Sequence, residues 1–119
     1  MGKQADSIVM SQHAGVTVGE FSQPKLLDEM SICRISDELG QLVDRTDKPM
    51  LVLDFSNVLY MSSVALGMLV TLRKRIGQRD GQLRLCSIHP DIHKVFVITK
   101  LTEVFEIHPE RAAALASLT

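Results

Sequence analysis

The stretch "LVLDFSNVLYMSSVALG" (Leu51–Gly67) connects two apolar runs through a polar turn and a pair of adjacent serines, Ser62 and Ser63. The first run extends over residues 49–55 and is flanked by turn residues, which is typical of a strand buried on both faces of a parallel sheet. The second run opens residues 63–79, a segment that is apolar nearly all round for two turns and then becomes basic. We therefore expect a central strand, followed by a helix that starts deep in the protein.

The segments before this stretch predict a hairpin and an amphipathic helix. β-branched residues at 8–9 and 16–21 flank the turn signal "HAG", which favours a short hairpin at a sheet edge. Over residues 28–44, apolar residues recur at three- and four-residue steps between charged ones. This spacing indicates a helix, with Asp28 or Ser31 available as its N-terminal cap.

The segments after it continue the alternation of strands and helices. "GQLRLCSI" (81–88) predicts a strand, and the helix after it has Pro90 in its first turn. "EVFEI" (103–107) predicts the last strand, followed by a closing helix with Pro109 in its first turn. Such alternation implies an α/β fold with a mixed, mainly parallel sheet of about four to five strands and about four helices.

Composition narrows the classes of function. The chain has 119 residues and a formal net charge of −1, so it lacks the basic field that binding to nucleic acid requires. A chain of this length predicts one domain over residues 1–119, and we expect residues 1–7 to be a flexible tail. No apolar run reaches the length of a signal-peptide core or a membrane span, which predicts a cytoplasmic protein without direct membrane insertion.

The sequence contains no motif typical of a metal site, a cofactor-binding site or a serine hydrolase. Cys33 and Cys86 form no CxxC pair, and we expect both to be small core residues rather than disulfide or zinc ligands. Between His89 and His93, Pro90 sets a helix start, so capping or solvated histidines are favoured over a metal site. The GxxxxGK[ST], GxGxxG and GxSxG motifs are absent, so we expect no cofactor, no bound nucleotide and no serine hydrolase.

The serine pair has two interpretations. Ser62 or Ser63 could simply cap the following helix by accepting a backbone N–H, which stabilises a helix by about 1 kcal/mol. A helix start also carries unpaired N–H groups and the positive end of the helix dipole. A phosphate attached to a serine at this position would therefore be tolerated by the fold.

Two segments carry a family resemblance. "LVLDFSNVLYMSSVALGML" and the downstream "DGQLRLCSIHPDIHKVFVITKL" resemble the anti-sigma factor antagonists of the STAS family, small bacterial α/β domains with a regulatory serine. The resemblance extends over about residues 16–118. The aspartate of the family signature falls on Ser62 and its phosphorylated serine on Ser63. The next four signature positions fall on Val64, Ala65, Leu66 and Gly67.

The resemblance implies a switch in transcription regulation. The unmodified domain would bind an anti-sigma factor that is also a serine kinase, and so free a sigma factor. Phosphorylation of Ser63, with Ser62 as the second candidate, would end that binding, and a serine phosphatase would restore it. The residues expected to contact the partner are Asp54, Asn57, Met61, Ser62, Ser63 and Val64.

Two other functions stay open at this point. The same fold could act as a scaffold that is not phosphorylated, in a stress-signalling complex or beside a membrane transporter. It could also be a small enzyme that uses a pocket at the strand ends. The replacement of the family's aspartate by Ser62 favours the scaffold, whereas the lack of an acid, base and nucleophile set disfavours the enzyme.

Overall fold

The computed structural model describes residues 8–118, so the tail expected at residues 1–7 lies outside the described residues. The chain forms a five-stranded sheet with helices on both faces. The elements are β1 (Ile8–His13), β2 (Val16–Phe21), β3 (Lys25–Leu26), α1 (Glu29–Arg45), β4 (Met50–Asp54), β5 (Tyr60–Met61), α2 (Ser63–Gly77), β6 (Gln82–Cys86), α3 (Pro90–Ile98), the 3-10 helix η1 (Leu101–Glu103), β7 (Glu106–His108) and α4 (Arg111–Ala116).

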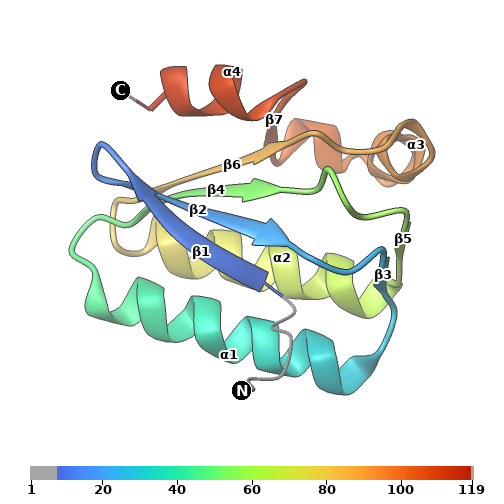
Figure 1. The fold of residues 1–119 in the computed structure, drawn as a ribbon, viewed down its shortest axis with the longest axis horizontal. Helices are drawn as coiled ribbons and strands as arrows, with labels where there is room; N and C mark the ends of the chain where they lie inside the picture. Colours follow the sequence, from blue (N-terminus) through green and yellow to red (C-terminus); the bar gives the residue numbers. More distant parts are fainter. Residues whose placement is uncertain (1–7, 119) are drawn as a thin grey trace.

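The main sheet has the strand order β1-β2-β4-β6-β7, with β4 in the centre. Strands β2, β4, β6 and β7 are parallel to one another, and β1 pairs antiparallel with β2. Figure 1 shows α1 and α2 on one face of this sheet and α4 on the other. The mixed, mainly parallel α/β fold predicted from the sequence is therefore confirmed.

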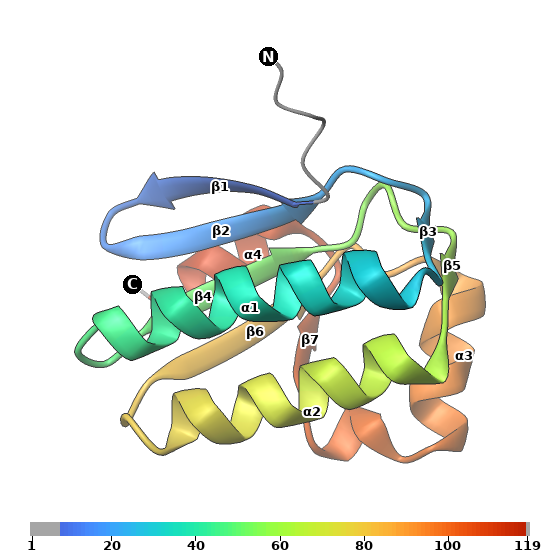
Figure 2. The ribbon, with the colours of Figure 1, turned by 90° about the horizontal axis from the view of Figure 1, so that it is seen from below.

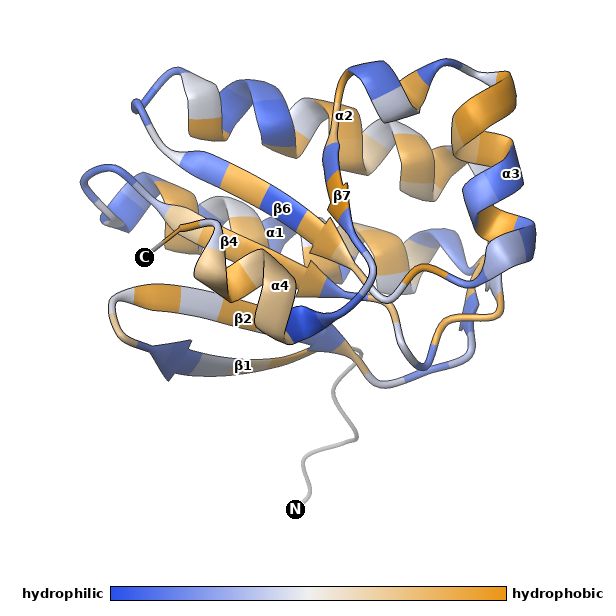
Figure 3. Cartoon of the chain, turned by 90° about the horizontal axis from the view of Figure 1, so that it is seen from above, coloured by the Kyte–Doolittle hydropathy of each residue, from blue (hydrophilic) through white to orange (hydrophobic). Residues whose placement is uncertain are grey.

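The central strand follows the prediction for residues 49–55 closely. Leu51, Val52 and Leu53 are all at most 1% exposed. Figure 3 shows β4 almost wholly apolar and β6 alternating between polar and apolar residues. A strand covered on both faces needs apolar side chains at every position, which explains the continuous run in the sequence.

The hairpin and the first helix also agree with the sequence. Ala14 and Gly15 link β1 to β2 with φ angles of 50° and 85°, the left-handed pair of a type I′ turn, whose twist matches that of the strands. Helix α1 begins after Asp28, whose Oδ2 accepts the backbone N–H of Ser31 at 3.1 Å. Asp28, rather than Ser31, is thus the cap.

Helix α2 does not start deep in the protein, and this expectation was wrong. Its first turns present Ser63, Val64 and Gly67 to solvent, while Ala65 and Leu69 point into the core and are fully buried. The helix begins at the edge where the parallel strands end, so only one of its sides can meet the sheet. Apolar composition alone did not distinguish a buried helix start from an exposed apolar surface.

Three smaller expectations were also wrong. The strand predicted at 103–107 begins only at Glu106, because residues 101–103 form η1. Pro109 precedes the cap of α4 instead of lying in its first turn. Cys33 is exposed on α1, whereas Cys86 is buried as expected, and burial raises the pKa of the Cys86 thiol to about 11.

The sheet has one large and one small apolar layer. The large core fills the space between the sheet and helices α1 and α2. The small one lies under α4 and consists of Val16, Val18, Val52, Cys86 and Ala114. Within residues 8–118, no helix combines the length and apolar character that crossing a membrane requires.

Candidate functional site

The serines lie where a second, two-stranded sheet meets the start of α2. Strand β3 pairs with β5 in parallel, with Lys25 opposite Tyr60 and Leu26 opposite Met61. The backbone N–H of Ser62 then donates to the carbonyl of Leu26 at 3.0 Å. Figure 2 shows this small sheet at the end of the molecule where α1 and α2 begin. The segment before the serines is therefore held by backbone hydrogen bonds as far as Ser62.

The two serines have different environments. Ser62 is the N-terminal cap of α2, half-buried, and its Oγ accepts the backbone N–H of Ala65 at 3.3 Å. Ser63 is the first residue of the helix and is exposed. Its hydroxyl makes no hydrogen bond to any of residues 8–118. The capping interpretation thus applies to Ser62 and leaves the Ser63 hydroxyl available to another molecule.

The electrostatic setting of Ser63 favours added negative charge. The first N–H groups of a helix have no acceptor within the helix, and they form the positive end of its dipole. The first turn of α2 contains no acidic residue. The basic residues Lys74 and Arg75 lie in the last turn of the helix. A phosphate on Ser63 would therefore lie beside a positive helix end without a neighbouring acidic residue in that turn.

Exposed apolar side chains lie next to the serines. Tyr60 is 56% exposed and Val64 43% exposed. The pairing of β3 with β5 brings Leu27 to the same region, because Leu27 directly follows Leu26, the residue bonded to Ser62. Leu59 precedes Tyr60 in the chain. Leu27 and Leu59 are both about half exposed. We call these four residues, Leu27, Leu59, Tyr60 and Val64, the apolar rim. Large apolar side chains exposed on neighbouring segments are a feature of surfaces that bind another protein.

Sequence reasoning missed three of the four rim residues. Leu27, Leu59 and Tyr60 lie in or beside two-residue strands, which are too short to show a periodic pattern. The only available signal was the presence of apolar residues in short polar connectors. Met61, which was predicted to contact the partner, is only partly exposed because its side chain packs against the large core.

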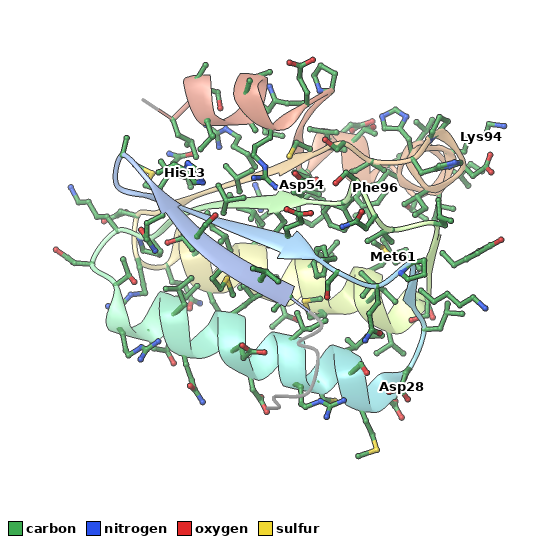
Figure 4. All side chains as sticks on the ribbon, in the orientation of Figure 1. His13, Asp28, Asp54, Met61, Lys94 and Phe96 are labelled. Carbon is green, nitrogen blue, oxygen red and sulfur yellow. The ribbon has the colours of Figure 1, made fainter. Side chains whose placement is uncertain are left out.

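Two predicted contact residues form side-chain hydrogen bonds to α4 and β2. The carboxylate of Asp54 is buried, with the residue 4% exposed, and accepts a hydrogen bond from Arg111 Nε at 2.8 Å. Asn57 is exposed and donates from Nδ2 to Glu20 Oε2 at 3.1 Å. Figure 4 shows Asp54 near the end of β4, away from Met61 on β5. The structure therefore brings together residues 61–64, and it places Asp54 in an ion pair that the sequence did not indicate.

Other potential sites are separate from the serines. His89 caps α3, with Nδ1 accepting the backbone N–H of Asp91 at 3.2 Å. Among residues 8–118, His, Cys, Asp and Glu side chains form no group of three that could hold a metal ion. A groove of about 700 Å³ lies between α2, β6 and the η1–β7 segment, and neither serine lines it.

Comparison with known proteins gives consistent matches. The sequence model of the STAS domain matches residues 7–114. An anti-sigma F factor antagonist from Paenibacillus polymyxa is 25% identical over 111 residues, which cover 93% of each chain. The structure of an anti-sigma-factor antagonist (STAS) domain protein from Planctomyces limnophilus has a TM-score of 0.86 at 24% identity and covers 98% of this chain and 100% of that chain. The Bacillus cell fate determinant SpoIIAA in its phosphorylated form has a TM-score of 0.72 at 15% identity, with 94% of this chain and 99% of that chain covered.

Proposed function

The chain belongs to the STAS domain family, and on this premise we propose that it is an anti-sigma factor antagonist switched by phosphorylation of Ser63. In its unmodified form it binds an anti-sigma factor that is also a serine kinase, and thereby releases a sigma factor. The observation that carries the proposal is the exposed Ser63 hydroxyl, which makes no hydrogen bond within residues 8–118 and lies at the start of α2 beside a serine that already caps the helix.

The proposed switch depends on how differently the helix start and a bound partner accommodate the charge of a phosphate. A phosphate adds about −1.5 to −2 charges and three acceptor oxygens. The start of α2 tolerates that charge, because it is the positive end of the helix. A partner seated on the apolar rim would have to desolvate the same charge, which is costly without a matching cation. Phosphorylation should therefore end binding and leave the fold intact.

The two serines are assigned different roles. Ser63 is the acceptor, and Ser62 holds the helix start, because its Oγ is already engaged with Ala65. Residues 61–64 contact the partner directly, and Asn57 lies at the border of that surface. Asp54 supports the site from within, since it is only 4% exposed. The name of the Paenibacillus relative supports the role of antagonist on which these assignments rest.

The proposed cycle places the protein in the cytoplasm, where sigma factors act. The kinase of the anti-sigma factor supplies the phosphate from ATP, and a serine phosphatase removes it. Neither nucleic acid nor insertion into a membrane has a part in this cycle. The chain acts throughout as a single domain whose own contribution is the surface around Ser63.

Phosphate mapping tests the proposal directly. The protein, incubated with its anti-sigma kinase and ATP, should gain one phosphate at Ser63, located by mass spectrometry. Ser63→Ala should gain none. Ser62→Ala should still be modified at Ser63, although loss of the cap lowers the free energy of unfolding by about 1 kcal/mol. Tight binding with both serines unmodified would favour the scaffold, and phosphate on Ser62 would reassign the acceptor.

Gly67→Ala should separate stability from binding. Gly67 is exposed and lies one turn after Ser63, on the same side of α2. A Cβ at this position meets no atom within 4 Å, so alanine should stabilise the helix by about 0.5–1 kcal/mol. The added methyl group projects toward the partner, and we expect binding to weaken by about tenfold.

Gly77→Ala is the matched control for this variant. Gly77 ends the same helix, and a Cβ there also meets no atom within 4 Å. Gly77→Ala should raise the melting temperature without changing the affinity for the anti-sigma factor. If Gly67→Ala binds the anti-sigma factor as tightly as Gly77→Ala does, the exposed side of the first turns of α2 is not part of the interface.

A further inference from the structure

Arg111 connects three elements that are distant in the sequence. It is the first residue of α4, and its guanidinium lies between carboxylates on two neighbouring strands. Its Nε donates to Asp54 Oδ2 at 2.8 Å, and its Nη2 donates to Glu20 Oε1 at 2.6 Å. Glu20 and Asp54 are register partners in the pairing of β2 with β4. The hydrogen bond to Glu20, followed by that to Asp54, raises the pKa of the Arg111 guanidinium.

The other oxygens of both carboxylates hold the segment that leads to the serines. We call residues 55–61 the connector. Asp54 Oδ1 accepts the backbone N–H of Ser56 at 2.8 Å. Glu20 Oε2 accepts a hydrogen bond from Asn57 Nδ2, which also donates to the carbonyl of Phe21 at 3.0 Å. Each carboxylate therefore uses one oxygen for α4 and the other for the start of the connector.

Arg111 is the cation that compensates these carboxylates. Asp54 is only 4% exposed, and within residues 8–118 its carboxylate forms an ion pair with Arg111 alone. Without the guanidinium, a buried carboxylate must take up a proton or turn toward water. Either change alters its hydrogen bond to Ser56. The position of the connector thus depends on a residue of the C-terminal helix.

We propose that Arg111 is a positioning residue, which acts through Asp54 and Glu20 to fix the start of the connector and so the placement of Ser63. This inference rests on the proposed function. Backbone bonds join the far end of the connector to residues 24–26, among them the bond from Ser62 to Leu26. Asp54 and Glu20 hold its start, so Arg111 acts on the angle at which the connector enters the β3–β5 sheet next to Ser63. Docking of α4 on the sheet consequently determines how Ser63 is presented to its partner.

Arg84 provides a matched control at the other end of α4. Its Nε donates to Ser117 Oγ at 3.0 Å and forms an ion pair with Glu106 at 2.9 Å. Arg84→Gln therefore loosens α4 without touching Asp54 or Glu20. Any effect that Arg111→Gln has and Arg84→Gln lacks belongs to the carboxylate pair, and not to weaker attachment of the helix.

The first measurement is hydrogen exchange of the free protein, which needs no partner. In Arg111→Gln the backbone amide of Ser56 should exchange about tenfold faster than in the wild-type protein, whereas Arg84→Gln should leave it unchanged. Arg111→Lys should restore part of the protection, because an ammonium group can reach one carboxylate at a time. Equal exchange in Arg111→Gln and Arg84→Gln would overturn the proposal.

The second measurement is the kinetics of Ser63 phosphorylation by the anti-sigma kinase. A mobile connector lowers the fraction of molecules that present the serine correctly, so Arg111→Gln should raise KM about fivefold with little change in kcat. The double variant Arg111→Gln/Asp54→Asn removes the unpaired charge and should recover thermal stability while KM stays high. A high KM in a protein of recovered stability excludes unfolding as the cause of the change in KM.

The outcomes separate the two proposals. Unchanged kinetics in Arg111→Gln, with Ser63→Ala still blocking phosphorylation, would overturn the positioning role and leave the proposed function standing. Failure of the wild-type protein to be phosphorylated would count against the proposed function. In that case the exchange of the Ser56 amide still decides whether Arg111 holds the connector.

Discussion

Replacing Ser63 by aspartate is expected to weaken binding to the anti-sigma factor by about 100-fold, or about 2.7 kcal/mol, and to leave the protein folded. The carboxylate brings a charge to the surface formed by residues 61–64 and the apolar rim. In a complex this charge loses water and gains no partner cation, which is the usual origin of such losses. Titration calorimetry with the purified anti-sigma factor measures the effect.

The same substitution should raise the free energy of unfolding slightly. Position 63 is the first residue of α2, and the first turn contains no acidic residue to repel a new one. A carboxylate at a helix N-terminus typically stabilises by about 0.3–1 kcal/mol. A variant that is as stable as the wild-type protein, or more so, and yet binds poorly would place the effect at the interface.

Two variants serve as controls for Ser63→Asp. Ser63→Ala removes the hydroxyl without adding charge and should change the affinity by less than about fivefold. Gln41→Glu adds one negative charge on the exposed side of α1 and should have no effect on binding. If Ser63→Asp binds the anti-sigma factor as tightly as Gln41→Glu does, the phosphorylation switch is wrong.

The sequence predicts those parts of the fold whose causes are local. The apolar run at 49–55 indicated the central strand, because a strand with two covered faces must be apolar throughout. The charged and apolar spacing over 28–44 indicated α1 and its cap at Asp28, which the structure confirms. The position of Ser63 at the start of a helix also followed from the transition between the two apolar runs.

Features that depend on contacts between distant residues were not predictable in this way. Strands β3 and β5 have two residues each and form only because they pair with one another. Arg111 bonds to Asp54 across 57 positions, and nothing near either residue marks the other as its partner. These two features hold the opposite ends of the connector. The sequence thus indicated that Ser63 opens a helix, but it did not indicate the elements that hold the connector at its two ends.

Glycine is a further case in which local rules and the structure differ. In the turn from α2 to β6, a glycine is usually expected where φ is positive. Here the positive φ, 58°, belongs to Asp80, and Gly81 follows it. Gly81 is needed because Pro49 and Ile76 leave no room for a side chain, and not because its backbone conformation requires glycine.

Gly81→Ala should therefore be strongly destabilising. A Cβ on Gly81 would lie within contact distance of the carbonyl oxygen of Pro49, 2.8 Å from Pro49 Cγ and 2.9 Å from Ile76 Cγ2. The Pro49 carbonyl cannot simply move away, since it accepts the backbone N–H of Gln82 at 2.9 Å. We expect a loss of about 3 kcal/mol and a decrease in melting temperature on the order of 10 °C.

Gly77→Ala is again the appropriate comparison for Gly81→Ala, because it makes the same chemical change four residues earlier in open space. Thermal unfolding followed by circular dichroism should rank the proteins Gly77→Ala, wild type and Gly81→Ala in decreasing stability. This turn lies at the opposite end of α2 from Ser63, so Gly81→Ala at a temperature well below its unfolding transition should still be phosphorylated normally. A melting temperature for Gly81→Ala equal to that of the wild-type protein would contradict this prediction. It would mean that Pro49 and Ile76 can separate at little cost, so that the start of β4 and the end of α2 are loosely packed.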